Sequence, residues 1–207
     1  MTVAILGLGN MGKGLVKRLA GKTNLVLGVR DAAAANAFAS GLSNVTVTTP
    51  AEAAAAADIV ILALPYGAAL EAAALPALKG KIVVDISNPV KPDFSGLSIG
   101  HTTSAAEELQ KAAPDAKIVK AFNTIFAGLF DAPIELTRNV PVFLAGNDAA
   151  AVDAVADLVT KAGFAVEKVG GLDGARLVEP VGMLNIRFGY GLGKGTAIAP
   201  SWLTLAA

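Results

Sequence analysis

The chain has 207 residues, 54% of them hydrophobic, and its 17 Lys and Arg balance its 17 Asp and Glu. This length suits one full domain with at most a small appendage. A balanced charge without a basic cluster argues against nucleic acid as a partner. The absence of cysteine excludes disulfides and thiol nucleophiles. With His101 as the one imidazole and no cluster of acidic residues, no metal site is expected.

Two features near the start of the chain concern its location. An apolar strand expected from about residue 2 leaves no room ahead of it for a signal peptide. The longest apolar stretch, residues 59–70, contains Pro65 and Gly67 and is too short and too broken to span a bilayer. We therefore expect a cytoplasmic protein with no membrane partner.

Apolar runs alternate with helix-like segments through the first half of the chain. The expected strands are residues 3–6, 24–28, 45–48, 59–62 and 82–85. The expected helices between them are residues 11–20, 32–39, 51–56 and 68–78. Near-continuous apolar strands that alternate with helices are typical of a parallel sheet covered on both faces. The pattern predicts the α/β class, with a Rossmann-type, doubly wound and mostly parallel sheet.

A second set of elements follows. We expect helices at 104–112, 148–162 and 173–188, and strands at 117–121, 141–144 and 165–168. Asn147 and Asp148 are candidate N-caps of the long helix, and Gly163 stands where a C-terminal cap belongs. No linker divides the chain, so residues 1–207 are interpreted as a single NAD(P)-binding domain. Residues 170–207 form its short C-terminal helix and glycine-rich tail.

The glycines of the segment VAILGLGNMGKG have the G-x-G-x-x-G spacing, directly after a strand and at the start of a helix. Gly7 permits a tight turn, Gly9 lets the backbone approach phosphates, and Gly12 lets the helix pack closely on the strand. The helix N-terminus offers free N–H groups and a partial positive charge to a pyrophosphate. We therefore predict a dinucleotide site on the loop, which also includes Leu8, Asn10 and Met11. The alternative is a glycine-rich turn kept for packing.

The residues that follow the second strand bear on which dinucleotide is bound. An NAD site places a carboxylate about 20 residues past the loop, whereas this chain has Val29 and Arg30 there. The planar fork of Arg30 suits the 2′-phosphate of NADP. Asp31 could serve the ribose, or it could be the N-cap of the helix at 32–39. We favour NADP as the cofactor.

Three further stretches carry a resemblance: DISNPVKPDFSG (85–96), TTSAAEELQKAAPDAKIVKAFNT (102–124) and GARLVEPVGMLNIRFG (174–189). Together with the glycine loop, they resemble the NADPH-dependent reductases of coenzyme F420 over nearly the whole chain. They are equally similar to the cytosolic reductase domain of the six-transmembrane metalloreductases. The resemblance implies hydride transfer between NADP(H) and a flavin-type ring, which is F420 in some members and FAD or FMN in others.

The resemblance also implies positions for the site. Leu64 and Pro65 would lie beside the nicotinamide ribose. The nicotinamide would be contacted by Asn88, Pro89 and Val90, and the meeting point of the two rings would be walled by Ala121, Phe122, Asn123 and Thr124. No catalytic residue is expected, only positioning by Asn123, Phe122 and Pro65.

Two departures from the family pattern bear on the ligands. F420-reducing members tend to carry histidine at the position of Asn123, whereas the metalloreductase domains carry asparagine. This difference favours FMN, FAD or riboflavin over F420. Val29 replaces a polar residue that usually precedes the arginine, so we expect NADPH to bind more weakly than in other members.

Several residues leave two interpretations open. Lys120 and Asn123 form the K-x-x-N spacing of β-hydroxyacid dehydrogenases, but Lys120 falls in a strand pattern that directs its side chain away from the site. His101 is either solvated or touches the acceptor. The glycines at 189–195 form either a flexible surface or the wall of an acceptor site. Trp202 and the apolar end of the chain are expected to pack on a second subunit, which gives a homodimer.

Three functions compete on these observations. The leading hypothesis is an NADP-dependent oxidoreductase with a flavin or F420 acceptor, because two cofactors supply the reacting atoms and the protein mainly orients them. A small-substrate dehydrogenase or imine reductase is the second, although such enzymes usually append a substantial helical domain. A non-enzymatic NADPH sensor is the third.

Overall fold

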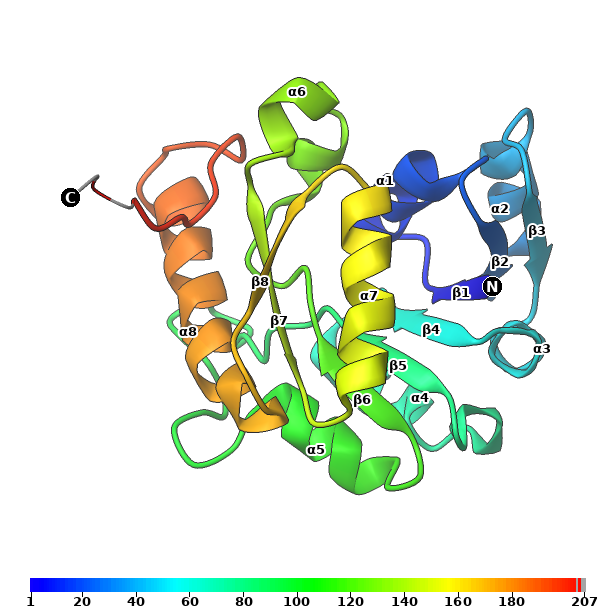
Figure 1. The fold of residues 1–207 in the computed structure, drawn as a ribbon, viewed down its shortest axis with the longest axis horizontal. Helices are drawn as coiled ribbons and strands as arrows, with labels where there is room; N and C mark the ends of the chain where they lie inside the picture. The colour runs from blue at the N-terminus through cyan, green and yellow to red at the C-terminus, as the bar shows by residue number, and fades with distance from the viewer. Residues whose placement is uncertain (204, 206–207) are drawn as a thin grey trace.

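A computed structural model describes residues 1–203 and 205 of the chain. Its centre is an eight-stranded sheet with the order β3-β2-β1-β4-β5-β6-β7-β8. In Figure 1, β3 lies at one edge of this sheet and β8 at the other. The strands are β1 (Thr2–Leu6), β2 (Asn24–Gly28), β3 (Val45–Thr48), β4 (Ile59–Leu62), β5 (Ile82–Asp85), β6 (Lys117–Lys120), β7 (Pro141–Gly146) and β8 (Ala165–Lys168).

The first six strands are parallel, β7 is antiparallel to β6, and β8 is parallel to β7. All the carboxyl ends of β1–β6 therefore meet at one edge of the sheet. The strand order reverses between β1 and β4, which is the switch point where open α/β sheets bind ligands. The Rossmann-type, mostly parallel fold expected from the sequence is confirmed.

Helices cover both faces of the sheet. They are α1 (Asn10–Leu19), α2 (Ala32–Ala39), α3 (Pro50–Ala56), α4 (Tyr66–Ala72), α5 (Ala105–Ala112), α6 (Ile134–Thr137), α7 (Ala149–Lys161) and α8 (Ala175–Ile186). One apolar core joins the sheet to α1 and α7, and a second, rich in alanine, joins it to α3, α4 and α5. Figure 1 shows α7 crossing one face of the sheet, and the first turns of α8 near α5.

Local signals in the sequence explain several helix ends. Asp31 is the N-cap of α2 and accepts a hydrogen bond from the Ala34 N–H at 3.1 Å. Asp148, rather than Asn147, is the N-cap of α7. Gly163 follows that helix with φ +85°, a conformation that favours glycine. The two cap positions at 148 and 163 are confirmed.

Several expected boundaries were wrong, among them the end of the strand expected at 141–144, which continues to Gly146. The helix expected at 68–78 begins at Tyr66 and ends at Ala72, and a separate 3₁₀ turn covers Pro76–Leu78 because Pro76 cannot continue an α-helix. The segment expected as one helix at 173–188 is a 3₁₀ turn, α8 and then a π-helix at Arg187–Gly191. The sixth strand ends at Lys120, one residue early, because the chain turns at Phe122 with φ +57°.

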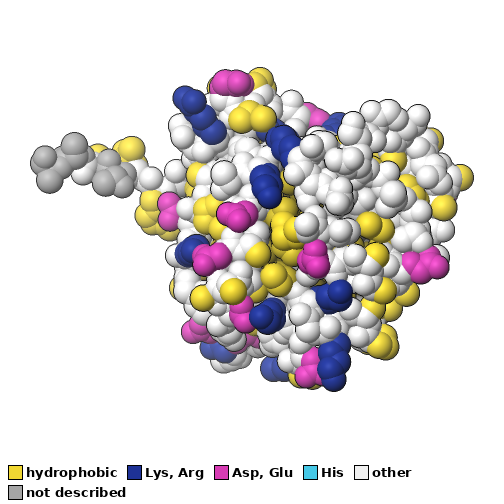
Figure 2. All heavy atoms as spheres, turned by 45° about the vertical axis from the view of Figure 1, so that its right-hand side comes forward, with side chains coloured by type: hydrophobic (Ala, Val, Ile, Leu, Met, Phe, Trp, Pro, Cys, Tyr) yellow, Lys and Arg dark blue, Asp and Glu magenta, His cyan; other side chains and the backbone are white. Residues whose placement is uncertain are grey.

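Figure 2 shows acidic and basic side chains interspersed over one face of the molecule. Among the residues that the structure describes, no helix is long and apolar enough to cross a membrane.

Candidate active site

The glycine loop lies between β1 and α1, at the carboxyl edge of the sheet. Gly7 has φ +101°, and a β-carbon there would lie 2.5 Å from the carbonyl oxygen of Ala63. A β-carbon on Gly12 would collide with the carbonyl oxygen of Gly7. A β-carbon on Gly9, in contrast, would meet no atom within 4 Å. The protein therefore leaves no space for a side chain at Gly7 and Gly12, whereas the space in front of Gly9 is open.

The open glycine is also the N-cap of α1, and no side chain caps this helix end. Leu8 and Met11 pack partly against the core, while Asn10 is exposed. No side chain of the loop caps the helix, so the backbone N–H groups at the start of this ten-residue helix are available to a ligand. Such a helix end attracts an anion through its N–H groups and its dipole.

Arg30 follows β2 at the same edge of the sheet and is exposed. In the described part of the chain, no ion pair or hydrogen bond of its guanidinium is found. Val29 beside it donates its N–H to Thr48 O at 3.1 Å, which ties the end of β2 to β3. Asp31 is engaged as the N-cap of α2. Of the residues at this strand end, Arg30 is the cation free to meet a phosphate.

Leu64 and Pro65 follow β4, the neighbour of β1. The Leu64 side chain reaches the glycine loop, where its Cδ2 would lie 2.9 Å from a β-carbon on Gly7. Pro65 is exposed and is the N-cap of α4. The structure therefore brings these two residues beside the glycine loop.

Two asparagines join the carboxyl ends of β5 and β6. Asn88 Nδ2 donates to Asn123 O at 2.7 Å, and Asn123 Nδ2 donates to Asn88 Oδ1 at 2.9 Å and to Val178 O at 3.2 Å. Asn123 is 6% exposed, and its Oδ1 has no hydrogen-bond partner in the described structure. Sequence reasoning placed both residues at the site but did not foresee their reciprocal pairing.

The remaining predicted residues lie on the same two loops. Ala121 and Phe122 are buried in the core, as is Thr124, and Phe122 holds a left-handed backbone conformation. Bulky residues adopt this conformation rarely, and only where the surroundings impose it. Pro89 is buried, and Val90 forms an isolated bridge with Leu97. The Phe122 ring faces the core, so it does not form an open wall.

Helix α8 covers the ends of β5 and β6. Its Asn185 donates to Thr124 O at 3.0 Å. At Gly182, a β-carbon would lie 2.7 Å from Asn88 Oδ1 and 2.8 Å from Asn123 O. Only a glycine allows the helix to approach the asparagine pair this closely.

A buried ion network, which sequence reasoning missed, lies beneath this pair. Lys120 Nζ contacts Asp85 Oδ2 at 2.7 Å, Glu179 Oε1 at 2.8 Å and Ser87 O at 2.5 Å, and all three charged side chains are essentially inaccessible to solvent. Glu179 also accepts from the N–H groups of Ala105 and Ala106 at the start of α5. The orientation expected for Lys120, away from the site, agrees with these contacts. The sequence did contain a signal for this network. Strand β5 ends in IVVD and its neighbour β6 reads KIVK, so the oppositely charged Asp85 and Lys120 lie side by side.

Tyr66 stands near this network at the start of α4. Burial, followed by the nearby carboxylates of Glu108, Glu179 and Asp85, raises the pKa of Tyr66. The phenol is therefore neutral at physiological pH.

An open groove of about 720 Å³ runs along the end of α8, the helix whose Gly182 packs on the asparagine pair, and Met183 of its lining is the next residue in that helix. Its lining is mostly apolar and contains one cation: Phe94, Met183, Ile186, Arg187, Tyr190, Gly191 and Leu192. A smaller hollow of about 380 Å³ shares Met183 and includes His101 and Pro180. The glycine-rich segment thus forms part of a groove wall. Gly189 packs on Phe126, since a β-carbon there would lie 2.5 Å from the ring.

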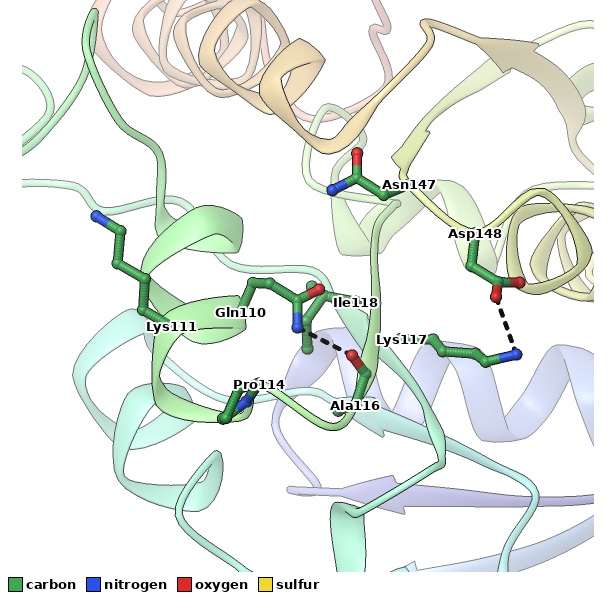
Figure 3. A pocket seen from close by; sticks show the side chains of 8 residues that line it. All are labelled: Gln110, Lys111, Pro114, Ala116, Lys117, Ile118, Asn147 and Asp148. Carbon is green, nitrogen blue, oxygen red and sulfur yellow. Dashed lines mark hydrogen bonds and ion pairs between the residues drawn. The ribbon is translucent and has the colours of Figure 1, made fainter.

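A further hollow of about 410 Å³ lies at the opposite edge of the sheet, where β6 begins (Figure 3). Its polar groups already bind one another: Lys117 pairs with Asp148 at 2.9 Å, and Gln110 donates to Ala116 O at 2.9 Å. It is remote from the glycine loop and the asparagine pair. Within residues 1–203 and 205, no group of three or more His, Asp or Glu side chains is arranged to hold a metal ion.

The fold and the open glycine loop define a Rossmann-type dinucleotide-binding protein. Residues 2–89 match the protein family described as "NADP oxidoreductase coenzyme F420-dependent". The chain is 30% identical to the F420-dependent NADP reductase of Methanocaldococcus jannaschii, over 96% of this chain and 97% of that protein. It therefore belongs to the family of F420-dependent NADP oxidoreductases, and is an NADP-dependent oxidoreductase of that family.

Two other relatives extend the comparison. Rat metalloreductase STEAP3 is 31% identical over 86% of this chain, but the chain spans only 36% of that protein's length. A crystal structure from Arthrobacter sp. FB24, provisionally described as an F420-dependent NADP reductase, has a TM-score of 0.80 and 32% identity, covering 94% of this chain and 96% of that chain. A reductive aminase from Aspergillus terreus has 20% identity and a TM-score of 0.69, which shows a shared fold.

Proposed function

We propose that this chain transfers a hydride between NADP(H) and a flavin-type acceptor, namely FMN, FAD, riboflavin or F420. The observation that carries the proposal is an apolar groove along the end of α8, the helix whose Gly182 packs on the asparagine pair at the carboxyl ends of β5 and β6. Two flat ring systems could then meet at the ends of β5 and β6.

The residues of this site fit NADP(H). The space in front of Gly9 and the uncapped start of α1 suit the pyrophosphate, with the loop residues 7–12 around it. Arg30, beside Val29, would pair with the 2′-phosphate. The unpartnered Asn123 Oδ1 would accept a hydrogen bond from the nicotinamide carboxamide. Leu64, Pro65, Asn88, Pro89, Val90 and Ala121 would complete the cofactor contacts.

The nicotinamide of NADPH supplies the hydride, and the reduced acceptor takes any further proton from water. The protein would contribute orientation and exclusion of water, which suits a site without an exposed acid–base pair. Asn123 and Asn88 would fix the ring plane. Pro65, which is exposed at the start of α4, would limit the positions that the ring can take.

The groove would hold the acceptor. The aromatic side chains of Phe94 and Tyr190 are largely exposed, and stacking on a flat ring would cover them. Arg187 could pair with the phosphate of an FMN, FAD or F420 tail. His101 lines the adjoining hollow and would touch the acceptor from there.

Stopped-flow oxidation of NADPH with F420, FMN, FAD and riboflavin tests the proposal. We expect rapid single-turnover oxidation with at least one of these acceptors. Binding of NADPH without oxidation by any of them would instead favour an NADPH sensor. Oxidation by an imine or a ketone alone would favour a small-substrate reductase.

Asn123→His tests acceptor selection at the asparagine pair. A neutral amide adds no charge to the site, whereas histidine can carry charge and suit an acidic acceptor such as F420. We expect the wild type to reduce FMN, FAD or riboflavin at least as efficiently as F420, and the variant to shift kcat/KM toward F420. A strong native preference for F420 that the variant leaves untouched would refute this role.

We also propose that the chain forms a homodimer. Several large apolar side chains of α8 and the tail are exposed: Leu177, Leu184, Trp202, Leu203 and Leu205. Large apolar side chains exposed in this number are commonly covered by a partner. Light scattering after size exclusion would test this proposal, and a monomer at micromolar concentration would refute it.

A further inference from the structure

The network of Lys120, Asp85 and Glu179 has an uneven charge. One ammonium faces two carboxylates, and each of the three side chains is essentially inaccessible to solvent. Lys120 Nζ donates to Asp85 Oδ2 and Ser87 O and forms an ion pair with Glu179 Oε1. With the ammonium and both carboxylates charged, the network has a net charge of −1, of which the N-terminus of α5 offsets only part.

The uncompensated buried charge lowers the stability of the fold, and the network lies at one particular place in it. A buried carboxylate without a matching cation destabilises a protein, so an apolar replacement would be the simpler way to fill the space. The network touches both elements that hold the asparagine pair. Ser87 precedes Asn88 on one side, and Glu179 follows Val178, which accepts from Asn123, on the other.

We propose that this buried negative charge stabilises the oxidised, positively charged nicotinamide relative to the reduced, neutral one. The inference depends on the proposed function, which places that ring at the asparagine pair. When a hydride leaves the dihydronicotinamide for the acceptor, two electrons and a proton depart together and the ring gains one positive charge. A fixed negative charge nearby, in surroundings that exclude water, favours that product and lowers the barrier toward it.

The test compares binding of NADP⁺ and NADPH to the same variant. Glu179→Gln keeps the side-chain shape and one acceptor oxygen and makes the network neutral. We expect the ratio Kd(NADP⁺)/Kd(NADPH) to rise by about 5- to 20-fold, the effect of one unit charge in partly buried surroundings. General damage to the site would weaken both ligands and cancel in the ratio.

Asp85→Asn neutralises the network from β5 instead of α8, and should move the ratio in the same direction. It keeps the inference testable if Glu179→Gln does not fold. Asp153→Asn, an exposed position on α7, is the control and should leave the ratio unchanged. A folded neutral variant that binds both ligands with the wild-type ratio would overturn the inference alone. Failure of the wild type to bind either ligand would overturn the proposed function and this inference with it.

Discussion

Gly182→Ala should disturb the asparagine pair without changing any polar group. The new β-carbon would lie 2.7 Å from Asn88 Oδ1 and 2.8 Å from both Asn88 Nδ2 and Asn123 O. Ordinary carbon contacts begin near 3.4 Å, so each of these atoms must move by at least about 0.6 Å. Such a movement strains the two reciprocal hydrogen bonds between Asn88 and Asn123, because these three atoms are among the four that form them.

The change in stability is the difference between the hydrogen bonds that are lost and the helix propensity that alanine adds. Two hydrogen bonds contribute about 1 kcal/mol each, and alanine regains up to about 1 kcal/mol in a helix. We therefore expect the free energy of unfolding to fall by about 1–2 kcal/mol. A displacement of this size at a reacting centre costs about 10- to 100-fold in rate. Hydride transfer should thus suffer more than stability.

Urea unfolding and single-turnover oxidation of NADPH measure the two effects. Gly67→Ala is the matched control, since Gly67 lies in α4 and a β-carbon there would meet no atom within 4 Å. The control should keep the wild-type rate and should be more stable by up to about 1 kcal/mol, since alanine favours a helix. If Gly182→Ala kept the wild-type rate and lost no stability, the close approach of α8 to the asparagine pair would not position the reactants.

Three other variants test separate parts of the chain. Arg30→Ala should weaken NADPH binding by about 1.5–3 kcal/mol and barely affect NADH, and equal losses for both would refute the phosphate contact. Gly9→Val should abolish dinucleotide binding while thermal unfolding stays near wild type, because the side chain would enter open space in front of the loop. Hydrogen bonds from Arg176 hold the pKa of Glu107 below its ordinary value, so the pair stabilises the fold above that value and loses the effect as pH falls through the folded pKa. Arg176→Met should therefore lower the urea midpoint at neutral pH, with a gap that narrows as the pH falls below the ordinary pKa of a glutamate, about 4.3.

The sheet was predictable because its signals are local. Five of the strands, at 24–28, 45–48, 59–62, 82–85 and 165–168, have the bounds expected from the sequence. Caps such as Asp31 act within one helical turn of their own helix, so the sequence beside them is enough.

The segment that follows Asn123 shows where local signals end. The 3₁₀ turn Ala127–Phe130 and helix α6 were not foreseen. Arg18 of α1 donates to Phe130 O at 2.7 Å, Leu129 O at 2.9 Å and Ala132 O at 2.6 Å. These bonds satisfy carbonyl groups that a short helix leaves open, but the donor stands more than 100 residues earlier in the chain. The pattern of apolar and polar residues within 125–137 therefore gives no indication that Arg18 stabilises this segment.

Helix α8 reverses the usual rule for amphipathic helices. Its buried face includes Glu179, Gly182 and Asn185 beside Ala175 and Val178, while Leu177 and Leu184 are 73% and 51% exposed. The hydrophobic pattern alone predicts that Leu177 and Leu184 face the core. That rotation of α8 about its axis would move Glu179 away from Lys120. The polar face is buried because the ends of β5 and β6 present an ammonium group and unpaired backbone carbonyls, which need polar partners more than apolar cover. The same reversal leaves the leucines facing outward, so the proposed second subunit and the proposed nicotinamide site would both depend on the orientation of this one helix.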